Sequence, residues 1–482
     1  MSDLSIPTSS FARIALGLVL ALPVACNKGN KDTETVTPAE PDTAVTTADE
    51  PAPEQTATTE ADACRDWSDV DVTALPALPD TPYTETFEKV WSLILEKHYD
   101  PTLNCLDWPA LREEYGTQLA DAKDQAAAYD IMTKMLQRLE QSHLAVVPPR
   151  ARVTGEPRAA VKAGDTEIPI EVRIIDGEAI VVDAAKHGTK SGMPGGAKLV
   201  AVADREVEPL LADVNEQHEK EIEASFLARR IIGSWLACGE GEKTKTLKFQ
   251  PFGSTKTKTK KIKCRKADVK RLSMGNLANV PAFVKHRMLP DSKVGYISFN
   301  IWMVPLVADI EAAMKELRAQ GMESLILDLR GNPGGVGAMA VPVGRMIMLQ
   351  DADLGVMHMR QGKQTFKVTM SKDPFAGPVA LLVDEGTAST SEIFGQALQD
   401  LGRVQVFGSG PSQGAALPSL IESLPGGAML QYVVADYISP NGIAVEGRGV
   451  QPDTLVTETR EAFSKGRDPV LEAAVSAVSL AK

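Results

Sequence analysis

The sequence predicts an α/β protein in which a helical segment, a strand-rich segment and an alternating strand–helix segment follow one another. Hydrophobic residues recur with helical spacing over residues 84–141. Short strands follow from about residue 165 to 275, and strands alternate with helices from about residue 293. Such alternation implies parallel βαβ units. We therefore expect an N-terminal helical subdomain, an inserted β-rich domain and an α/β core.

Length and composition are consistent with several domains. A chain of 482 residues with 43% hydrophobic residues can bury two or three cores. The net charge of −13 argues against a general nucleic-acid binder. We divide the chain into five segments: an export signal (1–26), a tether (27–80), a helical subdomain (81–150), a β-rich domain (151–280) and the core (281–482).

The N-terminus has the features of an export signal. Arg13 precedes a short apolar run that ends in small residues and Cys26, and this run is too short for a membrane span. Residues 22–26 resemble a bacterial lipobox, so we expect a lipid on Cys26 and anchoring to the cell envelope, in the periplasm or on the outer membrane. The alternative is an ordinary cleaved signal with a soluble product.

The next segment is rich in Thr, Pro, Ala and Glu. Residues 27–62 carry nine acidic side chains and only two lysines, with almost no large apolar residues. We expect a solvated, disordered tether that joins the anchor to the folded domains.

The remaining cysteines form an even set in an exported chain, which favours disulfides. Cys238 and Cys264 flank a predicted hairpin, and Cys64 and Cys105 would join the N-terminal segment to the helical subdomain. Their spacings fit no zinc pattern, and we expect no metal or other cofactor.

Three helices are expected in the helical subdomain. They run from about Phe87 to Leu95, from about Trp108 to Tyr115 with Pro109 in the first turn, and over residues 126–139.

The β-rich domain is expected to resemble a PDZ module. Residues 168–174 and 178–183 are predicted strands around a turn, and residues 191–204 place a glycine-rich turn before a strand. Residues 243–250 and 255–264 form a hairpin that alternates Lys and Thr. This hairpin could contact anionic surfaces, but a solvated edge that resists aggregation through its charge is the favoured interpretation.

The core is predicted from its strands and helices in order. Strands at 294–301, 324–329 and 377–384 alternate with helices at 305–320, 338–349 and 392–400. Active sites in parallel sheets lie beyond the carboxyl ends of the strands. The turn at Gly334–Gly335 and Ser389 both follow strand ends, so we expect them on the same rim.

Residues 386–392 (Gly-Thr-Ala-Ser-Thr-Ser-Glu) lie between a strand and a helix. Ser389 would therefore sit at the positive end of a helix dipole, where backbone N–H groups stabilise an oxyanion. By itself this segment could also be a helix cap, with Ser389 or Ser391 as the cap and Glu392 in the first turn.

Five motifs give the chain its resemblance to a known family. In order, they are 106–108 (Leu-Asp-Trp), 141–143 (Gln-Ser-His), 327–335 (Leu-Asp-Leu-Arg-Gly-Asn-Pro-Gly-Gly), 386–392 and 445–453 (Val-Glu-Gly-Arg-Gly-Val-Gln-Pro-Asp). In this order, over roughly residues 84–460, the chain resembles the S41 serine peptidases, which include C-terminal processing (tail-specific) and tricorn-type enzymes. The resemblance implies a crotonase-like catalytic fold with Ser389 as the nucleophile.

The chain departs from the processing-protease branch at one position. That branch carries a lysine base in a slot that falls nearest to Gly414, and glycine cannot accept a proton. The tricorn-like branch uses a histidine preceded by serine and a distant glutamate, which match His143, Ser142 and Glu446. The resemblance therefore implies a site without the lysine, with His143 as general base and acid and with Glu446 and Ser142 orienting it.

Other assignments are less specific. Backbone N–H groups of Gly334, Gly335 and Thr390 are expected to form the oxyanion hole. Glu446 could instead pair with Arg448 as a surface charge. Further expectations are a structural role for Asp328 and Arg330 and ordinary core packing for Trp302 and Met303.

The leading functional prediction is a lipid-anchored serine endopeptidase that acts on a protein or peptide through an acyl-enzyme. The PDZ-like domain would hold an extended segment or C-terminus of the substrate. The alternative is a non-catalytic binding lipoprotein on the same fold.

Overall fold

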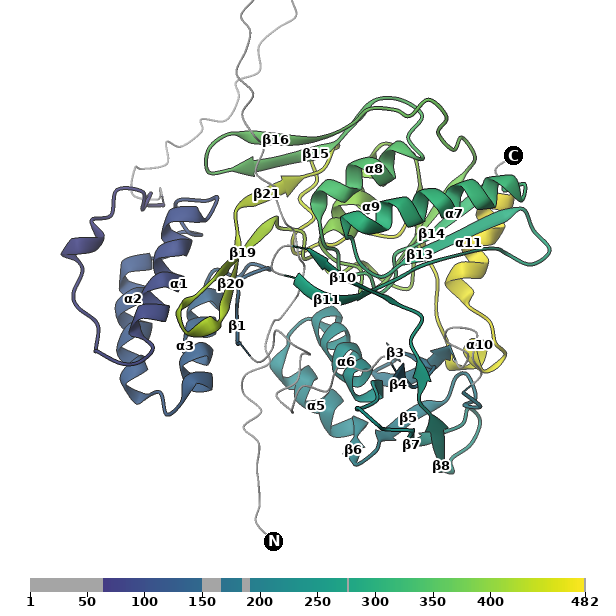
Figure 1. Ribbon diagram of the computed structural model, residues 1–482, viewed down its shortest axis with the longest axis horizontal. Coiled ribbons are helices and arrows are strands. Elements are labelled where there is room, and N and C mark those ends of the chain that lie inside the picture. Colours follow the sequence, from purple (N-terminus) through teal and green to yellow (C-terminus); the bar gives the residue numbers. More distant parts are fainter. Residues whose placement is uncertain (1–63, 150–165, 184–190, 275–276, 481–482) are drawn as a thin grey trace, which may run out of the picture.

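The computed structural model describes residues 64–149, 166–183, 191–274 and 277–480 (Figure 1). The predicted export signal, Cys26 and residues 27–63 of the tether lie outside these ranges. The helices are α1 (Thr84–Lys97), α2 (Trp108–Thr117), α3 (Gln125–Gln137), α5 (Val207–Gln217), α6 (Glu221–Leu236), α7 (Val307–Ala319), α8 (Ala340–Arg345), α9 (Thr390–Asp400), α10 (Arg460–Ser464) and α11 (Pro469–Leu480). Within the described ranges, no helix combines the length and hydrophobicity that crossing a membrane requires.

The strands belong to several small sheets and two larger ones. In the N-terminal part they are β1 (Ala145–Val147), β2 (Thr166–Glu167), β3 (Glu171–Ile175), β4 (Glu178–Asp183), β5 (Lys198–Val202), β6 (Arg205–Glu206), β7 (Thr244–Gln250), β8 (Lys258–Lys263), β9 (Arg265–Lys266), β10 (Lys270–Met274) and β11 (Leu277–Ala282). The remaining strands are β12 (Val284–Met288), β13 (Val294–Phe299), β14 (Ser324–Asp328), β15 (Ala352–Met359), β16 (Lys363–Val368), β17 (Val379–Val383), β18 (Gln405–Gly408), β19 (Ser419–Ser423), β20 (Met429–Val433), β21 (Ala435–Ile438) and β22 (Thr454–Leu455).

The core is built on a six-stranded sheet with the order β12-β13-β14-β17-β18-β22. All neighbouring pairs are parallel except β12–β13, which is antiparallel. The expected βαβ unit β13–α7–β14 is therefore confirmed, and β17–α9–β18 forms another unit whose last strand the sequence analysis did not assign. The helix predicted at 338–349 is shorter in the structure than expected, since α8 spans only Ala340–Arg345.

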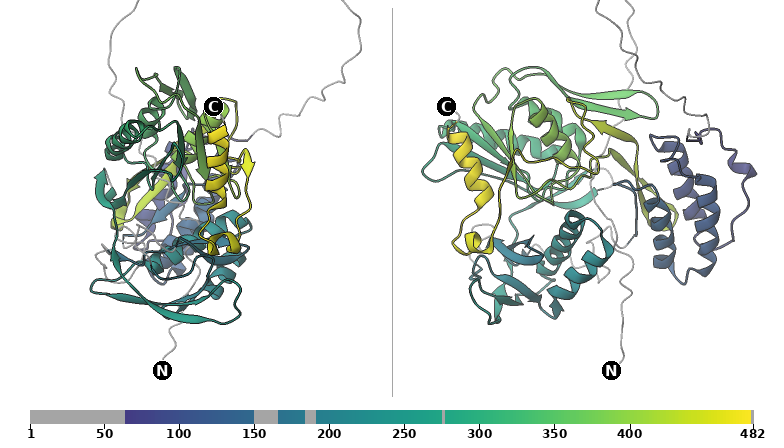
Figure 2. Two further views of the ribbon diagram at one scale, coloured as in Figure 1. Left: turned by 90° about the vertical axis from the view of Figure 1, so that its right-hand side faces the viewer. Right: turned by 180° about the vertical axis from the view of Figure 1, so that it is seen from behind.

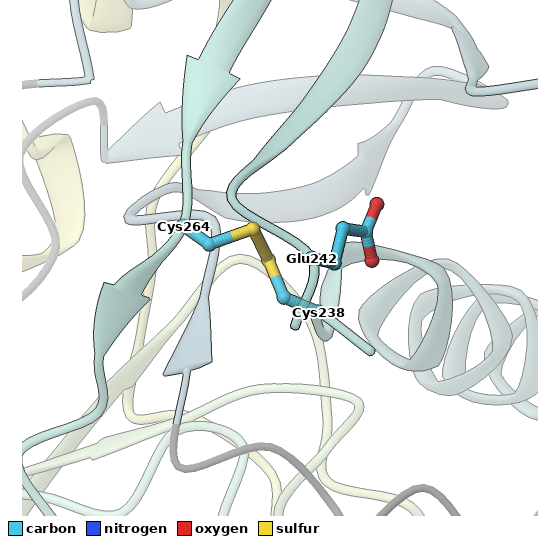
Figure 3. Close-up of side chains that lie close together, drawn as sticks. All are labelled: Cys238, Glu242 and Cys264. Carbon is cyan, nitrogen blue, oxygen red and sulfur yellow. A yellow bond between two sulfur atoms is a disulfide. The ribbon is translucent and has the colours of Figure 1, made fainter. Parts of the chain in front are cut away.

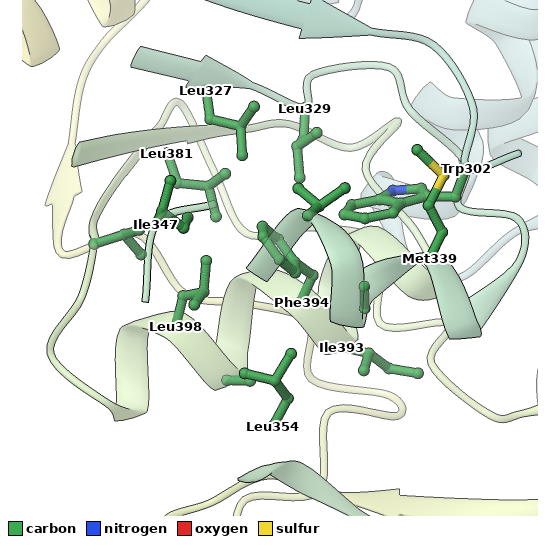
Figure 4. Close-up of a cluster of buried hydrophobic side chains, with 14 of the residues drawn as sticks. Trp302, Leu327, Leu329, Met339, Ile347, Leu354, Leu381, Ile393, Phe394 and Leu398 are labelled. Carbon is green, nitrogen blue, oxygen red and sulfur yellow. The ribbon is translucent and has the colours of Figure 1, made fainter. Parts of the chain in front are cut away.

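Alternate side chains of the central strands cover the two faces of this sheet, as the pleat requires. Leu325, Leu327 and Leu381 pack with residues of α7, α8 and α9 in one buried cluster, part of which is drawn in Figure 4. Ile326 and Leu382 point the other way and pack against α11. Helices therefore cover both faces, which fixes the carboxyl ends of β14 and β17 side by side.

The helical subdomain contains the three expected helices, but a distant part of the chain completes its core. The indole N–H groups of Trp91 and Trp108 each donate to the other's backbone carbonyl (2.9 and 3.1 Å). Residues of β19 and β20 pack into the same cluster, and β1 pairs antiparallel with β20. This pairing ties the end of the helical subdomain to the core, as the blue and yellow-green ribbons of Figure 1 show.

The tether prediction is wrong for its last part. Residues 64–80 belong to the fold, since Trp67 is only 7% exposed and its indole N–H donates to the Leu106 carbonyl (2.8 Å). The segment folds although most of its residues are polar, because burying the Trp67 side chain stabilises it by about 3 kcal/mol.

The β-rich domain has a main sheet in the order β3-β4-β5-β7-β8, with β6 paired to β5. The predicted hairpin is confirmed, because β7 pairs antiparallel with β8. Two helices that the sequence analysis did not assign, α5 and α6, pack beside this sheet (Figures 1 and 2).

Both predicted disulfides are present. Cys64 is bonded to Cys105, and Cys238 is bonded to Cys264. The Sγ atoms of Cys238 and Cys264 and a carboxylate oxygen of Glu242 lie within 4.8 Å of one another. Figure 3 shows the three side chains. Because the two sulfurs are bonded to each other, they are not free thiolates for a metal.

Candidate active site

Ser389 lies in a strained turn between β17 and α9. It is the N-cap residue of α9, with φ 55° and ψ −122°, and it is fully buried. A positive φ is costly for a residue with a Cβ and persists only where surrounding contacts hold it. The turn places the Ser389 hydroxyl at the N-terminus of the helix, where the helix dipole favours negative charge.

Two hydrogen bonds hold the Ser389 backbone in this conformation. Its N–H lies 2.8 Å from the Ala415 carbonyl and 2.9 Å from Glu392 Oε2. The Glu392 carboxylate is fully buried and also accepts from Ser412 Oγ (2.6 Å) and from the N–H groups of Gly414 (2.6 Å) and Ala415 (2.9 Å). Burial raises the pKa of Glu392 to about 7, against the lowering effect of these hydrogen bonds.

Ser389 is the N-cap residue and Glu392 lies in the first turn, as the cap alternative expected, but the Ser389 hydroxyl itself makes no hydrogen bond to the helix. Ser389 Oγ has no hydrogen-bond partner among the described residues. Ser391 Oγ accepts from Trp302 Nε1 (2.8 Å) and donates to the Asn332 carbonyl (3.1 Å). Ser389 is therefore a buried hydroxyl free to react, whereas Ser391 joins the helix to the core.

His143 lies between α3 and β1, at a position with φ 59°, and is 3% exposed. Its Nδ1 is 2.7 Å from Ser142 Oγ. Ser142 Oγ donates to Glu446 Oε2 (2.9 Å), and the Ser142 N–H donates to Glu446 Oε1 (2.8 Å). Because the Ser142 proton goes to the carboxylate, Ser142 Oγ accepts from Nδ1–H, which leaves His143 Nε2 unprotonated.

Burial governs the protonation of both titratable groups. It lowers the pKa of His143 to about 4, because the imidazolium loses its hydration. It raises the pKa of Glu446, although hydrogen bonds from Ser142 and from the backbone of Ala416 and Leu417 oppose this shift. The alternative pairing of Glu446 with Arg448 is not found, because the Arg448 guanidinium donates to Gln396 Oε1 (3.3 Å).

The segment at Ala415–Ala416 connects the serine to the histidine network. The Ala415 carbonyl accepts from the Ser389 N–H, and the Ala416 N–H donates to Glu446 Oε2 (2.8 Å). His143 Nε2 and Ser389 Oγ are both buried without a hydrogen-bond partner among the described residues. The fold thus brings Ser142, His143, Ser389 and Glu446 into one connected network, and leaves Ser389 Oγ and His143 Nε2 without partners among the described residues.

The turn that follows β14 packs directly on Ser389. A Cβ on Gly334 would lie 2.6 Å from the Ser389 Cβ and 2.9 Å from the Thr390 nitrogen. A Cβ on Gly335 would lie 2.2 Å from the Trp302 carbonyl oxygen. Glycine is required at both positions by the close approach of backbone and by φ values of 92° and 143°.

The oxyanion donors differ in part from the expectation. The Gly334 N–H donates to Asn332 Oδ1 (3.0 Å), so it is not available to a substrate. Within the described part of the chain, the N–H groups of Gly335 and Thr390 have no acceptor. Two of the three predicted donors are therefore free, and Gly334 contributes close packing instead.

The slot of the absent lysine is occupied by backbone. Gly414 has φ 76°, and a Cβ there would lie 3.0–3.1 Å from backbone atoms of Gly447, Arg448 and Gly449. Its carbonyl also accepts from the Gly447 N–H (2.8 Å). The chain following Glu446 fills this space, which is consistent with a site that uses a histidine.

The remaining predicted residues are structural. Arg330 is paired with Asp328 (2.7 Å) and Asp468 (2.9 Å), and Trp302 and Met303 are fully buried.

Sequence reasoning missed Glu392 as a hydrogen-bond centre, and it also missed the pair of Arg229 and Asp384. The Asp384 carboxylate accepts from the N–H groups of Gly331 (2.7 Å) and Gly386 (3.0 Å), and lies 2.5 Å from the Arg229 guanidinium. An aspartate between a strand and a glycine is a turn signal that could have identified Asp384. No local signal marks Arg229, which lies on α6 of the β-rich domain.

Comparisons with known proteins identify the relatives of this chain. Residues 293–456 match the model of peptidase family S41, and residues 79–137 match that of the tricorn protease C1 domain. The chloroplastic carboxyl-terminal-processing peptidase 3 of Arabidopsis thaliana is 26% identical over 384 residues, 78% of this chain and 69% of that protein. The chloroplastic C-terminal processing peptidase of Tetradesmus obliquus is 26% identical over 388 residues, 79% of this chain and 78% of that protein.

Solved structures share the fold. The photosystem II D1 C-terminal processing protease aligns with a TM-score of 0.51 and 23% identity over 83% of this chain and 98% of that chain. Mature CPAF complexed with lactacystin gives a TM-score of 0.53 and 13% identity over 82% and 98%. The fold and the buried serine at its strand–helix turn define a serine hydrolase. Residues 293–456 match peptidase family S41, and this match together with the C-terminal processing relatives identifies the chain as a serine endopeptidase.

Proposed function

We propose that Ser389 is the nucleophile of this peptidase, His143 its general base and acid, and Ser142 with Glu446 the pair that positions the imidazole. One observation carries this proposal. Ser389 Oγ and His143 Nε2 are buried, unpaired, and connected through Ala415–Ala416 and Glu446. A buried polar atom without a partner costs about 1–3 kcal/mol, and a catalytic role is one reason why such an atom is retained.

In the first half of the reaction, His143 Nε2 takes the proton of Ser389 Oγ as this oxygen attacks the carbonyl carbon of the scissile peptide bond. The N–H groups of Gly335 and Thr390 bind the resulting oxyanion. The Ser142 hydroxyl, which is held by Glu446, accepts from Nδ1–H and stabilises the transient imidazolium.

The imidazolium then donates its Nε2 proton to the leaving amine. The C–N bond breaks, and the acyl group remains on Ser389. In the second half, His143 removes a proton from a water molecule that attacks this ester, and it returns the proton to Ser389 Oγ. The acid product leaves, and the enzyme is regenerated.

We propose that the β-rich domain works as a PDZ-like module that holds an extended segment or the C-terminus of the substrate. β3 is an edge strand of its sheet and α6 packs beside it. A cleft of about 1590 Å³ opens here, with Ile170, Val172 and Leu236 in its lining. An extended peptide could add to the edge of β3 and place apolar side chains in this cleft. The related C-terminal processing peptidases, by their names, act at the carboxyl end of their substrates.

The mature chain is proposed to be exported and attached to the bacterial cell envelope by a lipid on Cys26. The two disulfides support an oxidising compartment. Metabolic labelling with a radioactive fatty acid tests the anchor, since Cys26→Ser should abolish incorporation.

A fluorophosphonate probe tests the catalytic assignment. The probe should label the purified protein on Ser389, because an activated serine attacks phosphorus. Ser389→Ala should remove both labelling and cleavage of an unstructured protein substrate. His143→Ala should reduce both strongly.

Two matched variants control for general damage. Ser476→Ala removes the exposed hydroxyl of a serine on α11, which donates only to the Glu472 carbonyl, and His358→Ala removes a half-buried histidine that pairs with Asp436. Both should keep labelling and turnover. Undiminished cleavage by Ser389→Ala in a folded protein would refute the nucleophile, and the absence of labelling in the parent protein would favour the binding protein.

A further inference from the structure

The β7–β8 hairpin carries a concentration of positive charge that runs against the rest of the chain. Residues 243–266, which we call the basic hairpin, contain nine lysines and one arginine and no acidic residue. The whole protein has a net charge of −13. Positive charge is therefore concentrated in the basic hairpin, whereas the chain as a whole is acidic.

One face of the basic hairpin carries its buried apolar side chains together with the exposed Lys258 and Lys260, and the other face carries lysine and threonine. Leu247, Phe249 and Ile262 pack into the core of the β-rich domain. On the opposite face, Thr246 lies across from Lys261, and Lys248 lies across from Thr259. The alternation spaces the charges along both strands and leaves this face without apolar side chains.

Most of these cations have no carboxylate partner in the part of the chain that the structure describes. Lys245 and Lys248 lie 3.4 Å from Glu242 and Glu206, and Lys260 donates to the Gly192 carbonyl (2.6 Å). Besides Lys260, seven exposed cations have no carboxylate partner among the described residues: Lys243, Lys256, Lys258, Lys261, Lys263, Arg265 and Lys266.

Protection of the open edge of β8 explains only part of this charge. One or two lysines on an edge strand are enough to oppose edge-to-edge pairing. Here the cations extend before β8 to Lys256 and beyond it to Arg265 and Lys266, where they repel one another and lower the stability of the hairpin. The excess indicates an external anionic partner.

The tip of the hairpin adds a second signal. Phe252 lies in the turn between β7 and β8 and is 44% exposed. An aromatic ring at the end of a basic element is typical of segments that lie at a membrane–water interface, where the ring enters the boundary between headgroups and acyl chains.

We propose that the basic hairpin docks on the surface of an anionic lipid bilayer, with its lysines on headgroup phosphates and Phe252 at the acyl boundary. Nine of its ten cations are lysines, which bind phosphates as point charges without the fixed geometry of guanidinium groups. Such a set fits a fluid layer of headgroups better than the ordered carboxylates of an acidic protein.

The expected lipid on Cys26 favours the same partner. Only 37 residues separate Cys26 from the first described residue, Cys64, so a lipid there would keep the folded part near a bilayer. One weak membrane signal is reversible, and a polybasic patch supplies a second. The hairpin lies at the end of the β-rich domain, away from α8 and α9 (Figure 1), so docking there leaves the catalytic core free.

Vesicle sedimentation tests this proposal without the anchor. The chain from residue 26, with Cys26→Ser to prevent acylation, is mixed with vesicles that contain phosphatidylglycerol or only phosphatidylcholine. We expect binding to the anionic vesicles alone, and weaker binding at higher salt. The triple variant Lys258→Gln/Lys261→Gln/Lys263→Gln should bind roughly a hundredfold more weakly, since each lysine is worth about 1 kcal/mol near such a surface. Phe252→Ser should lose about tenfold.

The matched control removes the same charge elsewhere. Lys97→Gln/Lys123→Gln/Lys315→Gln neutralises three exposed lysines outside the hairpin and should bind as the parent does. All variants should keep the parent's rate on a small soluble peptide, which shows that they fold. Ser389→Ala should bind vesicles normally, so failure of the catalytic proposal would leave this one standing.

Equal binding by the parent and the hairpin triple variant would overturn the proposal. So would binding to polyglutamate with none to anionic vesicles, because that result assigns the hairpin to an acidic polypeptide.

Discussion

At the scale of single residues, the site depends on a hydroxyl between an imidazole and a carboxylate. Ser142 donates to Glu446 and accepts from His143, so the carboxylate orients the ring without touching it. The arrangement fixes the tautomer that leaves Nε2 free to accept a proton. Because the Ser142 hydroxyl lies between Glu446 and the ring, the orientation of the imidazole depends on Ser142 as much as on Glu446.

We expect Ser142→Ala to lower kcat by about 10–100-fold with little change in KM, because removing the hydroxyl costs about 1–3 kcal/mol of hydrogen bonding at Nδ1–H. Ser142→Thr keeps the hydroxyl and should recover a substantial part of the rate. Steady-state kinetics on one peptide substrate measures both. Equal losses in the two variants would show that the hydroxyl does not orient the ring.

The pH profile should report the buried imidazole. Burial lowers the pKa of His143 to about 4 from its ordinary 6.5, so the base is neutral and competent well below neutral pH. We expect kcat/KM to fall on acidification with a midpoint below 6.5. The same shift means that the unfolded chain binds this proton more readily. Its contribution to stability is therefore present above pH 6.5 and is lost as the pH falls toward 4.

A pH–rate profile and denaturation curves over the same pH range measure these effects. A midpoint at or above 6.5 would mean that the imidazole of the free enzyme is more hydrated, or closer to a carboxylate charge, than this geometry allows.

At the scale of elements, two turns after neighbouring parallel strands form the reactive centre. The turn after β14 supplies Gly335, and the turn after β17 supplies Ser389 and Thr390. The Asp384 carboxylate joins the two turns, because it accepts hydrogen bonds from the N–H groups of Gly331 and Gly386. The proposed nucleophile and the proposed oxyanion donors are thereby held next to one another before any substrate arrives.

The packing of these turns predicts that Gly334→Ala inactivates the enzyme. The new Cβ would lie 2.6 Å from the Ser389 Cβ at a φ of 92°, so the nucleophile must move or the turn must open. We expect a loss of at least about 10²-fold in kcat/KM, as for loss of an oxyanion contact. Gly410→Ala is the control, because a Cβ there meets no atom within 4 Å. Activity of Gly334→Ala equal to that of Gly410→Ala would contradict this packing.

At the scale of the whole molecule, the catalytic turns are clamped from outside the core. Arg229 comes from α6 of the β-rich domain and reaches Asp384 (2.5 Å), Glu385 (3.1 Å) and Glu171 (3.3 Å). Asp384 is 2% exposed, and Arg229 holds its pKa well below the ordinary value despite burial. The β-rich domain and the catalytic turns are therefore electrostatically linked.

We expect Arg229→Met to lower the free energy of unfolding by about 3–5 kcal/mol, because it leaves the Asp384 charge buried without its counter-ion. The double variant Arg229→Met/Asp384→Asn removes both charges and should recover part of this loss. Chemical denaturation of the parent, both single variants and the double variant closes the cycle. Additive effects would show that the pair does not interact.

Local sequence patterns correctly identified many elements. The parallel strands at 324–329 and 377–384, the helix after Ser389 and both disulfides were predicted from periodicity, small residues and cysteine pairing. Hydrophobic periodicity gave the wrong assignment in two segments. α5 and α6 were missed within a run assigned to strands, and Trp67 was assigned to the tether because its neighbours are polar.

The sequence by itself determined the class of this protein, since the motifs that identify a serine peptidase are short and contiguous. Only the tertiary structure decided how the site works. Ser142 and Glu446 are 304 residues apart, Arg229 and Asp384 are 155 apart, and the Ser389 backbone is held by Ala415. Hydrophobic periodicity reports which face of an element is buried, but not which distant polar group it meets. Those contacts form only when strands from separate segments close into one sheet.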